Sequence, residues 1–100
     1  MLKISIIDSP KHRRLVLEGM LVAPWAAEVK RACESARVDL HGRELVVEVK
    51  SLDAISQEGE NVVLKLMSEG VKFRCSGVFT KHVFRELARR SRYSVKEMHS

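Results

Sequence analysis

The segment Glu44–Val49 constrains the fold more than any other, because it is an almost continuous run of aliphatic, mostly β-branched residues. Such a run is typical of a central strand in a parallel sheet. An amphipathic helical stripe precedes it within residues 24–37, and a second follows within residues 57–69. A central strand between two helices predicts crossover connections, which are right-handed almost without exception. The stripes are formed by Trp25, Val29, Ala32, Cys33 and Ala36, and by Val62, Val63, Leu66 and Met67.

The rest of the chain supplies three shorter strands and one more helix. Leu2–Ile7 and Arg13–Glu18 alternate apolar and polar residues, and the turn residues of Asp8–Lys11 join them, which predicts a hairpin. Val71–Cys75 alternates in the same way, and a third helix is expected from about Thr80. Residues 51–56 are interpreted as a loop.

These elements predict an α/β domain of the order β-β-α-β-α-β-α. The sheet is mixed and four-stranded, and polar residues on one face of three strands indicate that all helices pack on the other face. We expect residues 1–92 to form this single domain. Residues 93–100 are polar and are expected to form a frayed tail.

The sequence contains no pattern that points to catalysis. The glycines are scattered, the four histidines (His12, His41, His82 and His99) are isolated, and no Cys or His spacing suits zinc. Cys33 and Cys75 fall on apolar periodicities and are interpreted as buried thiols. We therefore expect no enzyme activity, no cofactor and no metal site.

The same survey predicts where the protein resides. No apolar run approaches the roughly 18 residues of a membrane span. The alternating start of the chain also lacks the apolar block of a signal peptide. A cytoplasmic protein that does not insert into a membrane is expected.

Positive charge is concentrated at the carboxyl end of the chain. Of the net charge of +5, residues 77–100 contribute +4, with six Lys or Arg against two Asp or Glu. Lys81, Arg85, Arg89 and Arg92 recur at helical spacing and form one basic row. The row is either a solvated helix face or a contact surface for an acidic partner. Nucleic acid is disfavoured, since Tyr93 is the only aromatic residue near the row.

The start of the second helix is the best candidate for a binding site. Ser56 has the side chain of an N-cap, and Glu58 and Glu60 place negative charge in the first turn. These residues either simply begin a helix or form a surface that a partner protein contacts. The candidate partner-binding residues are Ile55, Ser56, Gln57, Glu58, Gly59, Glu60 and Asn61.

Several short motifs together resemble the STAS domain, named for sulphate transporters and anti-sigma factor antagonists. They are Leu17–Leu21 ahead of Trp25, the strand Val46–Val49, the loop leading into Gly59, and Gly70–Phe73. The resemblance rests on their order and spacing and covers about residues 2–90. It implies a sheet with helices on one side and a role in binding other proteins.

The resemblance also implies a phosphorylation switch, from which this sequence departs. The family's loop reads roughly Asp-Ser-Ser-Gly, and its first serine is phosphorylated by a kinase that is also an anti-sigma factor. Ser56 falls on the family's aspartate, Gln57 on the phosphoacceptor serine and Glu58 on the next serine, so only Gly59 is kept. Glutamine has no hydroxyl group, and we expect the usual switch to be absent.

The leading hypothesis is a non-catalytic protein-interaction module in bacterial signalling, of the anti-sigma factor antagonist type and involved in the regulation of transcription. Its partner would be an anti-sigma factor or kinase, and a homodimer is compatible with the sequence. The alternative is an accessory STAS-like subunit of a membrane lipid or solute transporter. A nucleic-acid binder that uses the basic carboxyl-terminal helix is a third, weaker alternative.

Overall fold

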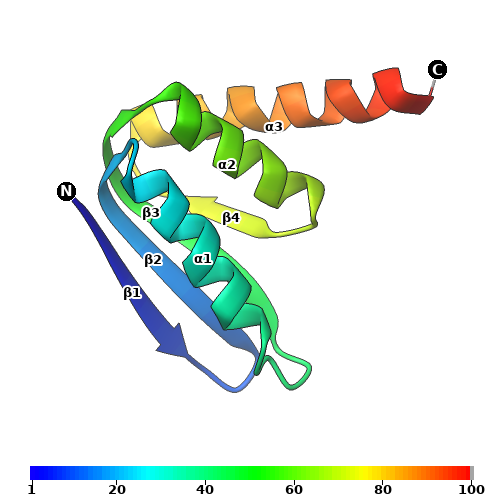
Figure 1. The fold of residues 1–100 in the computed structure, drawn as a ribbon. Coiled ribbons are helices and arrows are strands. Elements are labelled where there is room, and N and C mark those ends of the chain that lie inside the picture. Colours follow the sequence, from blue (N-terminus) through cyan, green and yellow to red (C-terminus); the bar gives the residue numbers. More distant parts are fainter. Residues whose placement is uncertain (100) are drawn as a thin grey trace.

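The computed structural model describes the backbone of residues 1–99 and the side chains of residues 1–91. Four strands and three helices follow one another in the predicted order, and the mixed sheet is confirmed (Figure 1). The elements are β1 (Leu2–Asp8), β2 (His12–Leu21), α1 (Trp25–Arg37), β3 (Glu44–Ile55), α2 (Gln57–Ser68), β4 (Lys72–Cys75) and α3 (Val78–His99).

The sheet has the spatial order β1-β2-β3-β4. The first hairpin pairs β1 with β2 antiparallel, with Ile4 opposite Leu17. The β2–β3 and β3–β4 pairs are parallel, and Val47 lies opposite both Leu15 and Phe73. Because parallel neighbours need crossovers, α1 and α2 each return the chain to the starting end of the sheet. All three helices therefore begin at the end of the sheet where the parallel strands finish.

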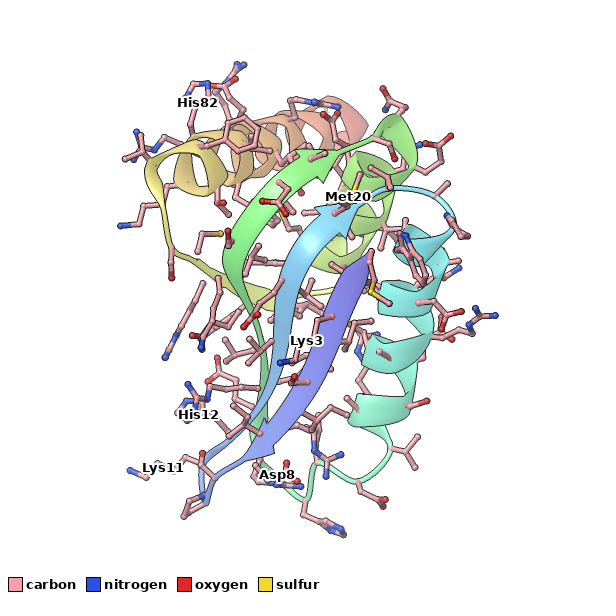
Figure 2. All side chains as sticks on the ribbon, turned by 90° about the vertical axis from the view of Figure 1, so that its left-hand side faces the viewer. Lys3, Asp8, Lys11, His12, Met20 and His82 are labelled. Carbon is pink, nitrogen blue, oxygen red and sulfur yellow. The ribbon has the colours of Figure 1, made fainter. Side chains whose placement is uncertain are left out.

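The helices cover one face of the sheet, as predicted. Leu15, Leu17, Val47 and Val49 point to this face and join one core cluster with Val29 of α1 and Phe84 of α3. The alternate residues point to the opposite face, where Arg14 and Glu48 form an ion pair of 3.1 Å between the guanidinium and the carboxylate. Figure 2 shows the sheet from its β1 edge, with α1 at the right, α3 at the top, and Lys3 on the side away from α1. The core therefore lies in a single layer between sheet and helices.

The prediction of a loop over residues 51–56 is wrong, because β3 continues to Ile55. The pairing of β2 with β3 shifts twice, after Val49 and after Leu52, so Lys50 and Asp53 each add one residue to β3. Such bulges leave the strand paired but change its side-chain period. The core-facing positions Val47, Val49, Leu52 and Ile55 are consequently spaced by two, three and three residues. This spacing lacks the regular period of two residues by which a strand is recognised in a sequence.

The other boundaries differ by a few residues from the predicted ones. β2 extends through Leu21, and α3 begins at Val78, two residues before the expected Thr80. The backbone of α3 is helical as far as His99, so it includes most of the predicted tail. Ser100 and the side chains from Arg92 onward lie outside the described residues, and fraying of this end stays a prediction.

Candidate functional site

The turn between β3 and α2 is held to β2 by a backbone hydrogen bond and is capped by a side-chain hydrogen bond of its own. The backbone N–H of Ser56 donates to the carbonyl oxygen of Leu21, the last residue of β2, at 3.1 Å. The Ser56 hydroxyl accepts a hydrogen bond from the N–H of Gly59 at 3.3 Å. Ser56 is therefore the N-cap of α2, as predicted, and one otherwise unpaired donor of the helix is satisfied.

Gly59 allows α2 to approach the end of β2. It is buried, and a Cβ atom at this position would lie 2.1 Å from the carbonyl oxygen of Leu21 and 3.0 Å from a side-chain carbon of Ile55. Backbone atoms of a strand cannot yield to such an overlap without moving the strand or the helix. Gly59 therefore allows α2 to pack closely on β2, and it is not part of the exposed surface of the site.

The exposed part of the site consists of Gln57, Glu58 and Asn61. The side-chain amide of Gln57 donates to the Oδ1 atom of Asn61 at 3.0 Å, one turn further along α2. The backbone N–H of Glu58 and the hydroxyl of Ser56 both lower the pKa of the Glu58 carboxyl group. This carboxylate is consequently negative under ordinary conditions and occupies donors at the start of the helix.

The remaining predicted site residues are partly engaged inside the fold. Glu60 forms an ion pair with Arg90 of α3, with 3.1 Å between carboxylate and guanidinium, which links α2 to α3. Ile55 and Ser56 are half-buried. The seven residues are thus adjacent, and three of them are exposed.

Exposed apolar side chains at the same end of the sheet were not identified from the sequence. Met20 near the end of β2 is 38% exposed, and Val78 and Phe79 at the start of α3 are 89% and 55% exposed. Met1 lies beside Met20 (labelled in Figure 2), because its carbonyl oxygen accepts a hydrogen bond from the Met20 N–H. The sequence feature that could have indicated these exposed side chains is the apolar pair Val78–Phe79, which directly follows Gly77 and lies outside the apolar stripe of the third helix. Exposed apolar residues that gather at one place often mark a protein contact.

The basic row of α3 is exposed as far as it is described. Lys81, Arg85 and Arg89 all point to solvent, and Arg89 forms an ion pair of 2.9 Å with Glu86 one turn earlier. The side chain of Arg92 lies outside the described residues. Within the side chains described up to Ser91, the row is separate from the start of α2, and Arg90, on another side of α3, pairs with Glu60 of that site.

The two cysteines of the described region are free thiols whose acidity is lowered by burial. Burial raises the pKa of both the Cys33 and the Cys75 thiol to about 11, although Cys75 is only partly buried. No group of three or more potential ligands in the described part of the chain could hold a metal ion. Within the same part, no helix has the length and apolar character needed to cross a bilayer.

Comparison with known proteins supports the fold. No family model and no curated protein matches the sequence. A similar solved structure is that of an uncharacterized protein from the DUF3478 family, with a SpoIIAA-like fold, from Shewanella loihica. The two chains are 22% identical, the match covers 84% of this chain and 74% of that one, and the TM-score is 0.52. The SpoIIAA-like fold is the STAS-like fold, so the predicted fold class is confirmed.

Proposed function

We propose that this chain is a non-catalytic protein-binding module of the STAS type, acting in bacterial signalling of the anti-sigma factor antagonist kind. The observation that carries the proposal is the exposed surface of Gln57, Glu58 and Asn61 at the end of the sheet where Met20 and Phe79 are also exposed. Exposed polar and apolar side chains at one end of a fold together suit a protein contact, which has an apolar core and a polar rim. The STAS-like fold is consistent with this role.

The proposed module is not switched by phosphorylation at the usual position of the loop. Gln57 occupies that position and has no hydroxyl group. The neighbouring Ser56 hydroxyl is half-buried and accepts a hydrogen bond from Gly59, so it is engaged as a helix cap. Partner binding at this site is therefore constitutive.

Site-specific photocrosslinking tests the contact surface. A photoreactive benzophenone residue placed at position 57 should give a discrete adduct with one protein in an extract of the native host. The same group at exposed Lys65, near the other end of α2, serves as the matched control. Excess unlabelled protein should suppress the adduct, and the variant Glu58→Lys should suppress it far less effectively. Equal adducts from both positions would contradict the proposed site.

A phosphorylation assay tests the absence of the switch. Incubation with ATP and a cognate anti-sigma kinase should leave the wild-type protein without phosphate in the peptide that contains Gln57. The variant Gln57→Ser provides the missing hydroxyl and should become a substrate if the loop still fits the kinase. Phosphate on Ser56 of the wild-type protein would refute the constitutive mode.

The two alternatives gain no separate support from the described residues. An accessory subunit of a lipid or solute transporter would use the same fold and the same end of the sheet. A nucleic-acid binder would use the exposed Lys81, Arg85 and Arg89, whose row carries no aromatic side chain in its described part. Retention of the protein on DNA that is lost in the double variant Arg85→Glu, Arg89→Glu would favour nucleic-acid binding.

A further inference from the structure

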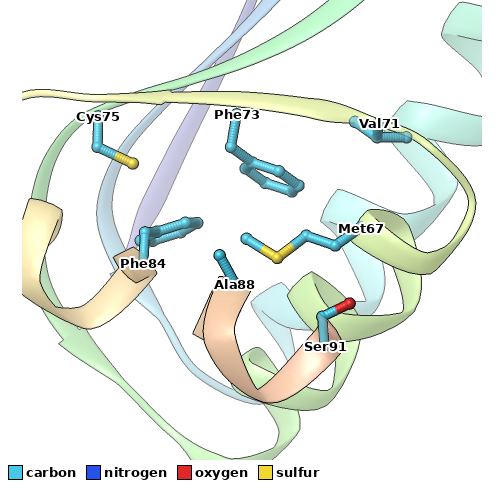
Figure 3. Close-up of a pocket in the computed structure, with 7 residues that line it drawn as sticks. All are labelled: Met67, Val71, Phe73, Cys75, Phe84, Ala88 and Ser91. Atoms are coloured by element: carbon cyan, nitrogen blue, oxygen red, sulfur yellow. The ribbon is translucent and has the colours of Figure 1, made fainter. Parts of the chain in front are cut away.

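An open pocket of about 330 Å³ lies between β4, α2 and α3 (Figure 3). Its lining is mainly apolar and includes Met67 of α2, Phe73 of β4, and Phe84 and Ala88 of α3. The rings of Phe73 and Phe84 are in contact, with their centroids 5.4 Å apart. The pocket is therefore an apolar recess beside the last strand of the sheet.

The strand that borders this pocket is an edge strand. β4 is last in the sheet order and pairs only with β3 among the described strands, so its outer backbone groups face no partner strand. Phe73 and Cys75 point to the pocket side, whereas Lys72 and Arg74 are exposed on the face that the helices leave open. An unpaired edge of this kind can accept an added strand through main-chain hydrogen bonds.

We propose that β4 and the adjoining pocket bind an extended segment of a partner protein in which acidic and apolar residues alternate. Successive residues of a strand point to opposite faces. An added strand would therefore place its acidic side chains beside Lys72 and Arg74 and its apolar side chains in the pocket. This surface lies along the side of the sheet, away from the start of α2, and the proposal goes beyond the protein-binding role of that site.

The charges along β4 support an acidic occupant. The ammonium group of Lys72 pairs with the carboxylate of Glu44 at 2.7 Å, but 70% of the Lys72 side chain remains exposed. Arg74 forms no ion pair among the side chains described up to Ser91, and it lies opposite Glu48 of β3, whose carboxylate pairs with Arg14. Lys81, at the start of α3, is close enough to Cys75 to lower the pKa of that thiol, although burial outweighs it. The acidic side chains of an added strand would therefore meet Lys72 and Arg74, whereas Lys81 lies nearer the pocket side of β4.

The same charges disfavour a second copy of this chain as the occupant. A symmetric antiparallel pairing of two β4 strands centred on Phe73 would place Lys72 opposite Arg74 of the other copy. Like charges directly opposite each other on neighbouring strands are destabilising. Charges that prevent self-pairing thus select a partner of the opposite sign.

Binding of synthetic peptides to the full chain tests the proposal. The probe is a fluorescein-labelled peptide of alternating Glu and Val with blocked ends, and the control peptide has Lys in place of Glu. We expect the Glu peptide alone to bind, to shift the backbone amide resonances of β4, and to bind more weakly at high salt. Equal affinity of the two peptides, or shifts confined to the start of α2, would overturn the proposal.

Three variants locate the contact. Arg74→Glu should weaken binding of the Glu peptide about 5- to 10-fold, because a favourable cross-strand charge pair becomes a repulsive one. Ala88→Leu should also weaken it by filling the pocket. Arg85→Glu makes the same charge change on the outer side of α3 and should leave the affinity unchanged.

Folding of the variants is checked by their amide spectra, and Arg74→Gln replaces Arg74→Glu if the charge reversal perturbs the strand. Undiminished binding by a folded variant at position 74 would refute the proposal. Because none of these changes touches Gln57 or Glu58, crosslinking from position 57 should persist in each variant. The two proposals can therefore fail independently.

Discussion

Replacing Gly59 with alanine tests how closely α2 approaches β2. In most helices this substitution is favourable by about 0.5–1 kcal/mol, because alanine has the better helix propensity and the smaller entropy loss. Here the new Cβ atom would lie 2.1 Å from the Leu21 carbonyl oxygen, where ordinary contacts begin at 3.4 Å. The first turn of α2 must therefore move by roughly 1 Å, which a close-packed interior resists.

Two destabilising contributions oppose the gain in helix propensity and determine the change in the free energy of unfolding. Overpacking a close-packed core costs about 1–3 kcal/mol. The displacement also lengthens the hydrogen bond from the Ser56 N–H to the same Leu21 carbonyl oxygen, now 3.1 Å, and this loss adds about 1 kcal/mol. After the propensity gain, we expect Gly59→Ala to lower the free energy of unfolding by about 2 kcal/mol.

Urea and thermal denaturation measure this change. In a domain of this size, a loss of 2 kcal/mol lowers the melting temperature by about 8–16 °C. The variant Lys65→Ala, at an exposed position of the same helix, should change the stability by no more than about 0.5 kcal/mol. An increase in stability in Gly59→Ala would refute the close approach of α2 to β2.

Three further predictions follow from the described contacts. Ser56→Ala removes the N-cap and should cost about 1 kcal/mol in urea denaturation, whereas Ser56→Asp should cost little. The side-chain hydrogen bond from Arg13 lowers the pKa of Asp8 in the folded state. The ionised Asp8 carboxylate therefore stabilises the folded protein at pH values above its unfolded pKa of ~3.9. The stability difference between wild type and Asp8→Asn should therefore vanish as the pH falls through the lowered folded pKa, and it should shrink at high salt. Because the pKa of both Cys33 and Cys75 is raised to about 11, iodoacetamide at pH 8 should alkylate each on the order of 100-fold more slowly than an unfolded cysteine. Rapid labelling of the fully buried Cys33 under native conditions would contradict its placement.

The sequence predicts those elements whose apolar residues keep a regular period. The alternation in β1 and β4 and the helical stripes in α1 and α2 follow directly from periods of two and 3.6 residues. β3 was predicted only as far as Val49, because the two bulges change the spacing of its inward residues after that point. A bulge depends on the neighbouring strand, so a local pattern does not reveal it.

The candidate site shows a similar division between local and long-range causes. The N-cap role of Ser56 follows from the residues next to it, and it is confirmed. The burial of Gly59 against Leu21 and the ion pair between Glu60 and Arg90 join segments that are far apart in the sequence. No local pattern contains that information. The exposure of Phe79 likewise depends on where α3 begins relative to β4.

The arrangement of charge at the start of α2 explains why a phosphate would contribute little there. A phosphate at a helix N-terminus is stabilised by unpaired N–H groups and the positive end of the helix dipole. Here the Ser56 hydroxyl already accepts from the Gly59 N–H, and the Glu58 carboxylate already takes its own N–H. A phosphate at position 57 would meet this carboxylate as a like charge and find few free donors. The Glu58 carboxylate therefore gives this loop a permanent negative charge, where a phosphorylated loop would gain one only on modification. The proposed partner of the site should present a basic surface to this charge.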